Sequence, residues 1–278
     1  MTAGRLPWRI EEACWNAFPS LGQVLLGNWL MRFSEGLSRR ANSINPLANP
    51  LANPLANPLA NPSGNPLGNP PSARGADIAA AIAAGEALYH ARGLPVIFRV
   101  PSIVDPALDH ELAARGYTRE GESCVLYGDI AGLDLGGGAP DAAIRLWPSP
   151  APQWLRAMAR LQGHTRAQGA TYRRIVGAIA LPARFALLAE GGAPAGLAYG
   201  AIHDGLLTYE SVVTDPVRRR RGLARRVIAS LAAWARDSGA TGACLEVAAG
   251  NAPARALYAG FGLAEVYRYH YRREPPQH

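Results

Sequence analysis

Apolar residues recur at helical spacing in the last quarter of the chain. Five of them follow the i, i+3, i+4, i+7, i+11 pattern of one helix face: Ala224, Val227, Ile228, Leu231 and Ala235. Gly239 follows the last of these residues and is typical of a helix end. The pattern predicts a helix over 222–238.

The rest of the second half alternates between short apolar runs and segments with helical spacing. The runs predict strands over 143–147, 185–190, 196–202, 206–214, 243–248 and 264–271. The helical segments are 151–166, 172–179 and 253–261. Strands that alternate with helices indicate an α/β fold class.

The first half shows a similar alternation. Its pattern predicts helices over 9–17, 77–93 and 106–115, with Asp77 as the N-cap of the second helix. It predicts strands over 29–33, 40–44, 95–100 and 117–127. The run 29–33 and the run 40–44 are expected to pair with each other.

Two low-complexity segments divide the chain. An Asn-Pro-Leu-Ala repeat occupies 45–72, and proline at every fourth position excludes both a helix and a central strand. We interpret the repeat as an expanded surface loop, because loop closure costs little extra free energy as a loop lengthens. A glycine-rich stretch over 131–141 is the best domain boundary. We therefore expect one domain over 1–130 and a second over 142–273.

The composition indicates the cellular compartment of the protein, but it leaves several classes of ligand open. The 278 residues carry a net charge of +7, and all 28 basic residues are arginine. Such a charge suits nucleic acid, a polyphosphate ligand or an acidic protein surface. Cys14, Cys124 and Cys244 have neither disulfide-framework nor metal-ligand spacing, which favours a reducing cytoplasm and no metal site. The first 33 residues lack a long apolar stretch, so we expect no signal peptide and no membrane partner.

The distribution of the arginines is more informative than their number. The predicted strand 206–214 leads through Pro216 into the run Arg218–Arg221, and the predicted helix begins at once. The first turn of a helix offers unpaired N–H groups and the positive end of the helix dipole, and Gly222 and Ala224 allow a phosphate to approach closely. The segment has neither the P-loop pattern nor the dinucleotide-binding glycine pattern. It predicts a binding site for some other phosphate-bearing ligand.

Two motifs in the second half resemble signatures of the GNAT superfamily of N-acetyltransferases. Arg219-Arg-Arg-Gly222-Leu-Ala224 resembles the pattern Arg/Gln-x-x-Gly-x-Gly/Ala. Downstream, 251–263 resembles the pattern Asn-x-x-Ala-x-x-Leu-Tyr-x-x-x-Gly-Phe, with Leu263 where phenylalanine is usual. Both motifs occur in the family's order, and the resemblance covers 142–271. It implies a mixed, mostly antiparallel central sheet flanked by helices.

The resemblance also implies acetyl-CoA as cosubstrate and a role for each matching residue. Tyr258 would protonate the departing thiolate, and a phenol suits this role because it stays protonated at pH 7. Asn251 would hydrogen-bond the cofactor near its pantetheine arm, whose backbone partners would be Val212, Val213 and Thr214. The cofactor pyrophosphate would bind the backbone of Arg219, Arg220, Arg221, Gly222, Leu223 and Ala224.

A general base must deprotonate the attacking amine. Glu246 precedes Tyr258 by twelve residues, which is the spacing in GNAT enzymes that acetylate the N-terminal alanine of a ribosomal protein. Glu246 is therefore the favoured base. Glu210 on the neighbouring predicted strand is the rival, and a water chain without either carboxylate is the third alternative.

The first half resembles a degenerate copy of the second. Phe98-Arg99-Val100 aligns with Leu245-Glu246-Val247, and the segment from Leu112 to Tyr117 aligns with the segment from Tyr258 to Leu263. Arg99 and Leu112 then replace the base and the acid. We therefore expect two GNAT-like lobes in tandem, of which the first has lost catalysis.

The predicted function is acetyl transfer from acetyl-CoA to a primary amine by direct attack. The acceptor is a peptide N-terminus or a small amine, and the segment 154–179, with His164 and Tyr172, is expected to shape its site. A monomer and a homodimer both remain open. One alternative is a catalytically silent acyl-CoA-binding regulator. A nucleic-acid-binding protein is less favoured, because no recognition helix, zinc spacing or RNA-binding motif accompanies the arginines.

Overall fold

The computed structural model describes residues 6–47, 71–135 and 141–276, with side chains from residue 78 in the second range. The chain forms two compact units. The C-terminal unit comprises residues 1–21 and 123–267, and the N-terminal unit comprises residues 22–122 and 268–278. Most of the repeat at 45–72 and the middle of the linker at 131–141 lie outside the described residues.

The C-terminal unit has a mixed, mostly antiparallel sheet, as the sequence predicts. Its strand order is β11-β5-β10-β9-β8-β7-β6. Pairing is antiparallel from β6 through β9 and between β10 and β5, and it is parallel between β9 and β10. The strands are β5 (Thr118–Asp129), β6 (Ile144–Trp147), β7 (Ala183–Glu190), β8 (Ala193–His203), β9 (Leu206–Thr214), β10 (Gly242–Ala248) and β11 (Ala264–Arg273).

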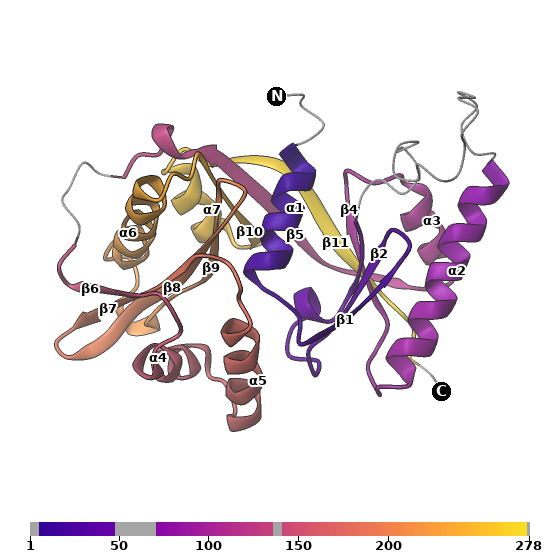
Figure 1. Cartoon of the computed structure of the whole chain (residues 1–278), viewed down its shortest axis with the longest axis horizontal. Helices are drawn as coiled ribbons and strands as arrows, with labels where there is room; N and C mark the ends of the chain where they lie inside the picture. Colours follow the sequence, from indigo (N-terminus) through magenta and orange to yellow (C-terminus); the bar gives the residue numbers. More distant parts are fainter. Residues whose placement is uncertain (1–5, 48–70, 136–140, 277–278) are drawn as a thin grey trace. The chain divides into compact units, whose positions relative to one another are not determined.

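Helices cover both faces of this sheet. The apolar stripe of α6 (Leu223–Asp237) is buried against one face, together with Tyr258 of α7 (Ala252–Ala259). On the other face, Trp154 of α4 (Pro152–Gln162) packs edge-on against Phe185 and donates its Nε1–H to the carbonyl of Ala186 at 3.0 Å. Figure 1 shows α6 on one side of β7 and β8 and α4 on the other.

The predicted division of 151–179 into two helices is shifted in the structure. The helix expected over 151–166 ends at Gln162, because Gly163 adopts a left-handed conformation with φ +64°. Thr165 then begins α5 (Arg166–Gly177) with a capping box that it shares with Gln168. Helix α5 therefore begins earlier than the predicted 172–179.

The first helix belongs to the C-terminal unit. The face of α1 (Leu6–Ala17) that carries Ile10 and Cys14 is buried. The side chain of Arg9 lies 2.8 Å from a carboxylate oxygen of Asp204, and the hydroxyl of Tyr199 donates to the carbonyl of Ala17 at 2.9 Å. The N-terminal unit, which comprises residues 22–122 and 268–278, therefore differs from the expected lobe 1–130 at both ends. The apolar stripe of α1 shows that one face must be covered, but not which sheet covers it.

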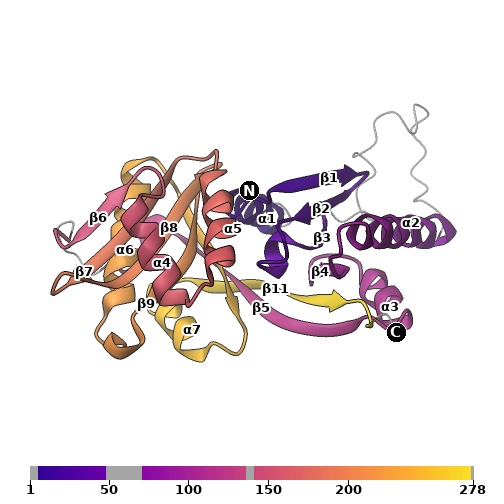
Figure 2. The same ribbon diagram turned by 90° about the horizontal axis from the view of Figure 1, so that it is seen from below.

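The N-terminal unit contains strands in the order β1-β2-β3-β4-β11. The pairs β1–β2, β2–β3 and β4–β11 are antiparallel, and β3–β4 is parallel. In Figure 2, β1, β2 and β3 lie close together near α2. The elements are β1 (Gly22–Leu26), β2 (Trp29–Phe33), β3 (Ile44–Pro46), α2 (Pro71–His90), β4 (Ile97–Pro101) and α3 (Ala107–Ala114).

Two predictions for this unit are wrong. The expected strand 40–44 is largely a turn, because Arg39–Ala41 forms a 3₁₀ helix and the Ser38 side chain accepts from its second N–H. The strands that flank β2 are instead β1 and β3. Helix α2 begins at Pro71, so Asp77 lies within it and is no N-cap. Proline suits a first helical position because it lacks the N–H that would have no partner there.

Each unit also contains a strand from the other half of the chain. β5 ends the first half of the sequence, yet its residues 123–129 pair with β10 in the C-terminal unit. β11 ends the second half, yet its residues 269–273 pair with β4 in the N-terminal unit. This exchange places the boundaries of the two units inside β5 and β11.

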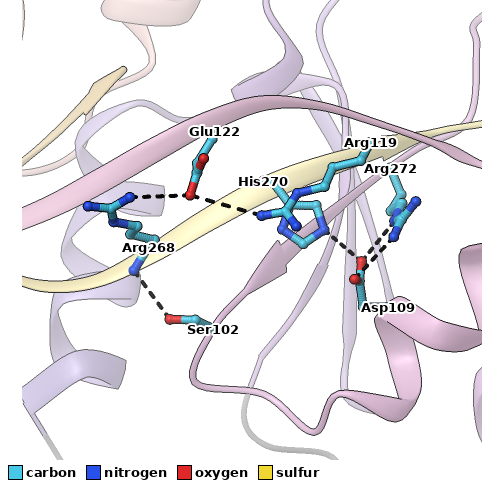
Figure 3. A network of polar contacts seen from close by, with 7 residues as sticks. All are labelled: Ser102, Asp109, Arg119, Glu122, Arg268, His270 and Arg272. Carbon is cyan, nitrogen blue, oxygen red and sulfur yellow. Dashed lines mark hydrogen bonds and ion pairs between the residues drawn. The ribbon is translucent and has the colours of Figure 1, made fainter. Parts of the chain in front are cut away.

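A polar network fixes β11 within the N-terminal unit, as Figure 3 shows. Nε2 of His270 lies 2.6 Å from a carboxylate oxygen of Asp109, and the guanidinium of Arg272 reaches both oxygens of that carboxylate at 2.8 and 3.1 Å. Burial tends to raise the pKa of Asp109, but the hydrogen bonds from Arg272 and His270 outweigh it and lower the pKa to about 2. The network therefore joins α3 to β11 through a carboxylate that stays ionised.

Candidate active site

The strands β9 and β10 are paired only over their first residues. The parallel register joins Gly242–Cys244 to Leu206–Thr208. Beyond this point β10 stays paired with β5 as far as Ala248, and β9 stays paired with β8 as far as Thr214. Within the described part of the chain, the facing edges of the two strands have no strand partner there. A ligand with amide groups could therefore pair with either edge as an added strand.

A bulge lies in the unpaired half of β9. Its register with β8 shifts between Leu197↔Val213 and Tyr199↔Glu210, so that Ser211 and Val212 together oppose one residue of β8. Ser211 adopts a φ of +54°, which is unusual for a residue other than glycine. The bulge separates Glu210 from the stretch Val212–Thr214, which the family resemblance predicts to pair with the cofactor arm.

The N-terminus of α6 is open to a ligand. Gly222 is its N-cap in a left-handed conformation with φ +74°, no side chain caps the helix, and no acidic residue lies in the first turn. A Cβ atom placed on Gly222 would meet nothing within 4 Å. The first N–H groups of the helix therefore combine with the positive dipole end and open space, which suits a phosphate group.

Most of the arginines around this turn are held by carboxylates. A carboxylate oxygen of Glu190 on β7 lies 3.2 Å from a guanidinium nitrogen of Arg221. In contrast, Arg219 and Arg220 are exposed and have no ion pair or side-chain hydrogen bond with the described residues. They are thus available to an anionic ligand. The remaining ion pairs of these arginines with the described residues are Arg218–Glu190, Arg218–Asp215, Arg225–Asp134, Arg226–Asp141 and Arg226–Glu190.

Glu190 is a residue of this site that the sequence analysis missed. In the sequence, Glu190 lies at the end of a predicted strand, directly before two glycines, and nothing in this pattern indicates a role for it. An acidic residue next to an arginine-rich turn is noticeable only when strand and turn are known to meet.

Tyr258 and Glu210 interact electrostatically. Tyr258 is 6% exposed and Glu210 is 4% exposed, and Glu210 lies in the unpaired half of β9. Burial raises the pKa of Tyr258, and the charge of Glu210 raises it further. The phenol therefore stays protonated at neutral pH.

The other predicted residues lie on the same unit. Glu246 is half-buried on β10, opposite Val125 of β5 and beyond the last pair with β9. Asn251 is exposed, and its side-chain oxygen caps α7 by accepting from the N–H of Ala254 at 3.2 Å. Leu223 is buried in the core, so only its backbone is available to a ligand.

These residues fit acetyl-CoA. An open helix end and two unpaired arginines suit its phosphates, and unpaired strand edges suit the amides of its pantetheine arm. The described residues contain no cluster of metal-ligating side chains. None of the described helices is both long enough and apolar enough to cross a membrane.

Comparisons with known proteins identify the family of the chain. A family model described as "Probable histone acetyltransferase Rv0428c C-terminal" matches residues 8–272. The "Uncharacterized N-acetyltransferase YobR" of Bacillus subtilis (strain 168) is 23% identical over 265 residues, which cover 95% of this chain and 97% of that protein. The family match begins at residue 8, within α1, so it includes the half in which the sequence showed only a degenerate copy.

Solved structures show the same fold. A GCN5-related N-acetyltransferase from Kribbella flavida has a TM-score of 0.66 at 17% identity and covers 100% of this chain and 97% of its own. A tandem GNAT protein from the clavulanic acid biosynthesis pathway has a TM-score of 0.57 at 16% identity, over 72% of this chain and 70% of its own. The predicted GNAT fold is thereby confirmed, and a tandem arrangement exists among the similar structures.

Proposed function

The chain belongs to the Rv0428c C-terminal family of acetyltransferases, and we propose that it transfers an acetyl group from acetyl-CoA to a primary amine. It is a GNAT-type N-acetyltransferase, as its relatives also indicate. The observation that carries the choice of donor is the open N-terminus of α6 next to the separating strands β9 and β10.

The cofactor would bind along these two features. Its pyrophosphate would accept hydrogen bonds from the backbone of 219–224, and the exposed Arg219 and Arg220 would pair with its phosphates. Its pantetheine arm would pair with the backbone of Val212–Thr214, which brings the thioester to the bulge of β9. The amide nitrogen of Asn251 would donate to the arm while its oxygen caps α7.

The chemistry follows from two buried groups, Glu210 beside the bulge of β9 and Tyr258 of α7. The amine nitrogen attacks the thioester carbonyl carbon, a C–N bond forms, and the carbonyl becomes a tetrahedral oxyanion. The C–S bond then breaks, and Tyr258 gives its proton to the thiolate. The proton of the amine passes to a carboxylate.

We assign the role of base to Glu210 rather than to the initially favoured Glu246. Of the two carboxylates, Glu210 is the one whose charge raises the pKa of Tyr258, after the larger effect of burial. It is also buried at the separation of the strands, whereas Glu246 is half-buried on β10. Glu246 remains the alternative to be tested beside it.

The N-terminal unit would serve the reaction indirectly. At the positions aligned with Glu246 and Tyr258 it has Arg99, buried over the ring of Tyr269 at 3.7 Å, and the fully buried Leu112. Neither residue can replace a carboxylate base or a phenol acid. The first half of the sequence instead supplies residues 123–129 of β5, which lie in the C-terminal unit and pair with β10 along the whole length of that strand.

The acceptor is a peptide N-terminus or a small amine. The family description refers to a histone acetyltransferase, which supports including peptides among the acceptors. The test is a calorimetric titration of the whole chain with acetyl-CoA, followed by thiol release with a panel of peptides, polyamines and amino acids. Binding with thiol release supports the proposal. Binding without release to any amine indicates a silent acyl-CoA-binding regulator, and duplex DNA binding without acetyl-CoA binding indicates a nucleic-acid binder.

A further inference from the structure

The bulge of β9 contains a residue in an unfavourable backbone conformation. A left-handed φ brings the Cβ of an L-residue too close to its own backbone, and only glycine adopts it without cost. Ser211 nevertheless has a φ of +54° in the middle of the strand. Such a conformation persists only where the surroundings enforce it.

The hydroxyl of Tyr172 contacts this residue directly. Its oxygen lies 2.6 Å from the Oγ of Ser211, which is a short hydrogen bond between two hydroxyl groups. Tyr172 comes from α5, on the face of the sheet opposite α6. The bond therefore joins a helix to the strained residue of the strand.

The ring of Tyr172 is held in place by its own neighbours. It is 5% exposed and lies parallel to the indole of Trp154, with 6.4 Å between the ring centroids. The rings of His164 and Phe18 lie at 5.4 and 6.4 Å. Trp154 is in turn fixed to β7 through the carbonyl of Ala186. Tyr172 can therefore orient Ser211, because its ring cannot follow a movement of the strand.

From this arrangement we infer that Tyr172 is a positioning residue, whose hydroxyl holds the Ser211 bulge in the shape that the active site requires. Ser211 separates Glu210 from Val212–Thr214, so its backbone angles set the direction of the carboxylate and the path of the cofactor-binding edge. The inference deepens the proposed function and rests on it.

The test removes the hydrogen bond and then removes the strain. Tyr172→Phe keeps the packed ring and loses the hydroxyl, and we expect acetyl-CoA to bind roughly 3- to 10-fold more weakly, the effect of one net hydrogen bond. Ser211→Ala removes the same bond from the strand side and should have the same effect. Ser211→Gly should bind acetyl-CoA as the wild type does, because glycine adopts the left-handed conformation freely.

The double variant separates positioning from general damage. If Tyr172 acts through the bulge, Tyr172→Phe combined with Ser211→Gly should bind acetyl-CoA within about twofold of Ser211→Gly alone. A double variant as weak as Tyr172→Phe would overturn the inference, since Tyr172 would then act elsewhere. Wild-type affinity in Tyr172→Phe would also overturn it.

Amide hydrogen exchange gives a readout that does not depend on the cofactor. In the cofactor-free chain, residues 211–214 should exchange faster in Tyr172→Phe than in the wild type, and the double variant should exchange at the rate of Ser211→Gly alone. If the wild type fails to bind acetyl-CoA, the proposed function is wrong, while this exchange pattern still decides whether Tyr172 holds the bulge. Unchanged exchange in Tyr172→Phe would show that it does not.

Discussion

Replacing Gly222 with alanine tests the cofactor-binding turn, and the same helix offers a matched control. Gly222 lies at the N-terminus of α6 with φ +74°, and Gly239 follows its C-terminus with φ +84°. A Cβ atom at either position meets nothing within 4 Å, so neither substitution causes a clash. Each substitution places a side chain in the left-handed region at a cost of about 1 kcal/mol. In a unit of this size, that cost lowers the Tm by roughly 2–4 °C.

Only one of the two substitutions should affect the cofactor. A methyl group on Gly222 occupies the open space in which a phosphate would approach the first N–H groups of α6. We expect the affinity for acetyl-CoA to fall at least about tenfold, which corresponds to about 1.4 kcal/mol. Gly239→Ala should bind acetyl-CoA as the wild type does.

The assay is a calorimetric titration of both variants with acetyl-CoA, together with thermal unfolding of each. Equal losses of affinity in the two variants would mean that stability, and not the turn, controls binding. Wild-type affinity in Gly222→Ala would place the phosphates elsewhere and refute the assignment of this turn.

Three further predictions concern the acid, the base and the polar network of the N-terminal unit. Tyr258→Phe should lower turnover by roughly 10²- to 10⁴-fold with acetyl-CoA affinity within about twofold of the wild type, and unchanged turnover would exclude Tyr258 as the acid. Glu210→Gln removes the carboxylate that would take the proton of the amine, so the rate at neutral pH should fall. If Glu246→Gln produces the rate loss and Glu210→Gln does not, our assignment of the base is wrong. Asp109 has a pKa of about 2, below its ordinary 3.8, so it stabilises the fold above the ordinary value and ceases to do so as the pH falls towards 2. Asp109→Asn should therefore lower the Tm at pH 7 by an amount that shrinks below pH 4, and a constant difference across this range would indicate packing instead.

Elements with a strong local signal could be predicted from the sequence. The strand over 206–214 has the predicted bounds, and the predicted helix over 222–238 is α6 to within one residue at each end. Both signals lie entirely within the segment, as a branched apolar run or a helical stripe. The prediction of Asp77 as an N-cap was wrong because the local sequence does not distinguish an acidic residue within a helix from one that begins a helix.

Pairing between distant strands could not be predicted in this way. The alignment of Arg99 with Glu246 and of Leu112 with Tyr258 identified two similar halves, which implies two similar sheets. Alternation along a strand shows which face is buried, but it does not show which strand is the neighbour. Nothing in the sequence of either half therefore indicates that β5 and β11 pair with strands of the other half. The expected boundary at 130 accordingly differs from the boundaries of the two units, which lie within β5 and β11.

The choice between the two carboxylates shows the same limit at the scale of one site. A spacing of twelve residues links Glu246 to Tyr258 within one motif, and a motif records only what is near in sequence. Glu210 precedes Tyr258 by forty-eight residues and lies on β9, outside both motifs, so only the folded chain shows that its charge acts on the phenol. The bulge at Ser211 then decides how Glu210 and the edge after it are presented. Because that bulge depends on a hydroxyl from α5, the geometry of the proposed base is set by a residue outside both motifs.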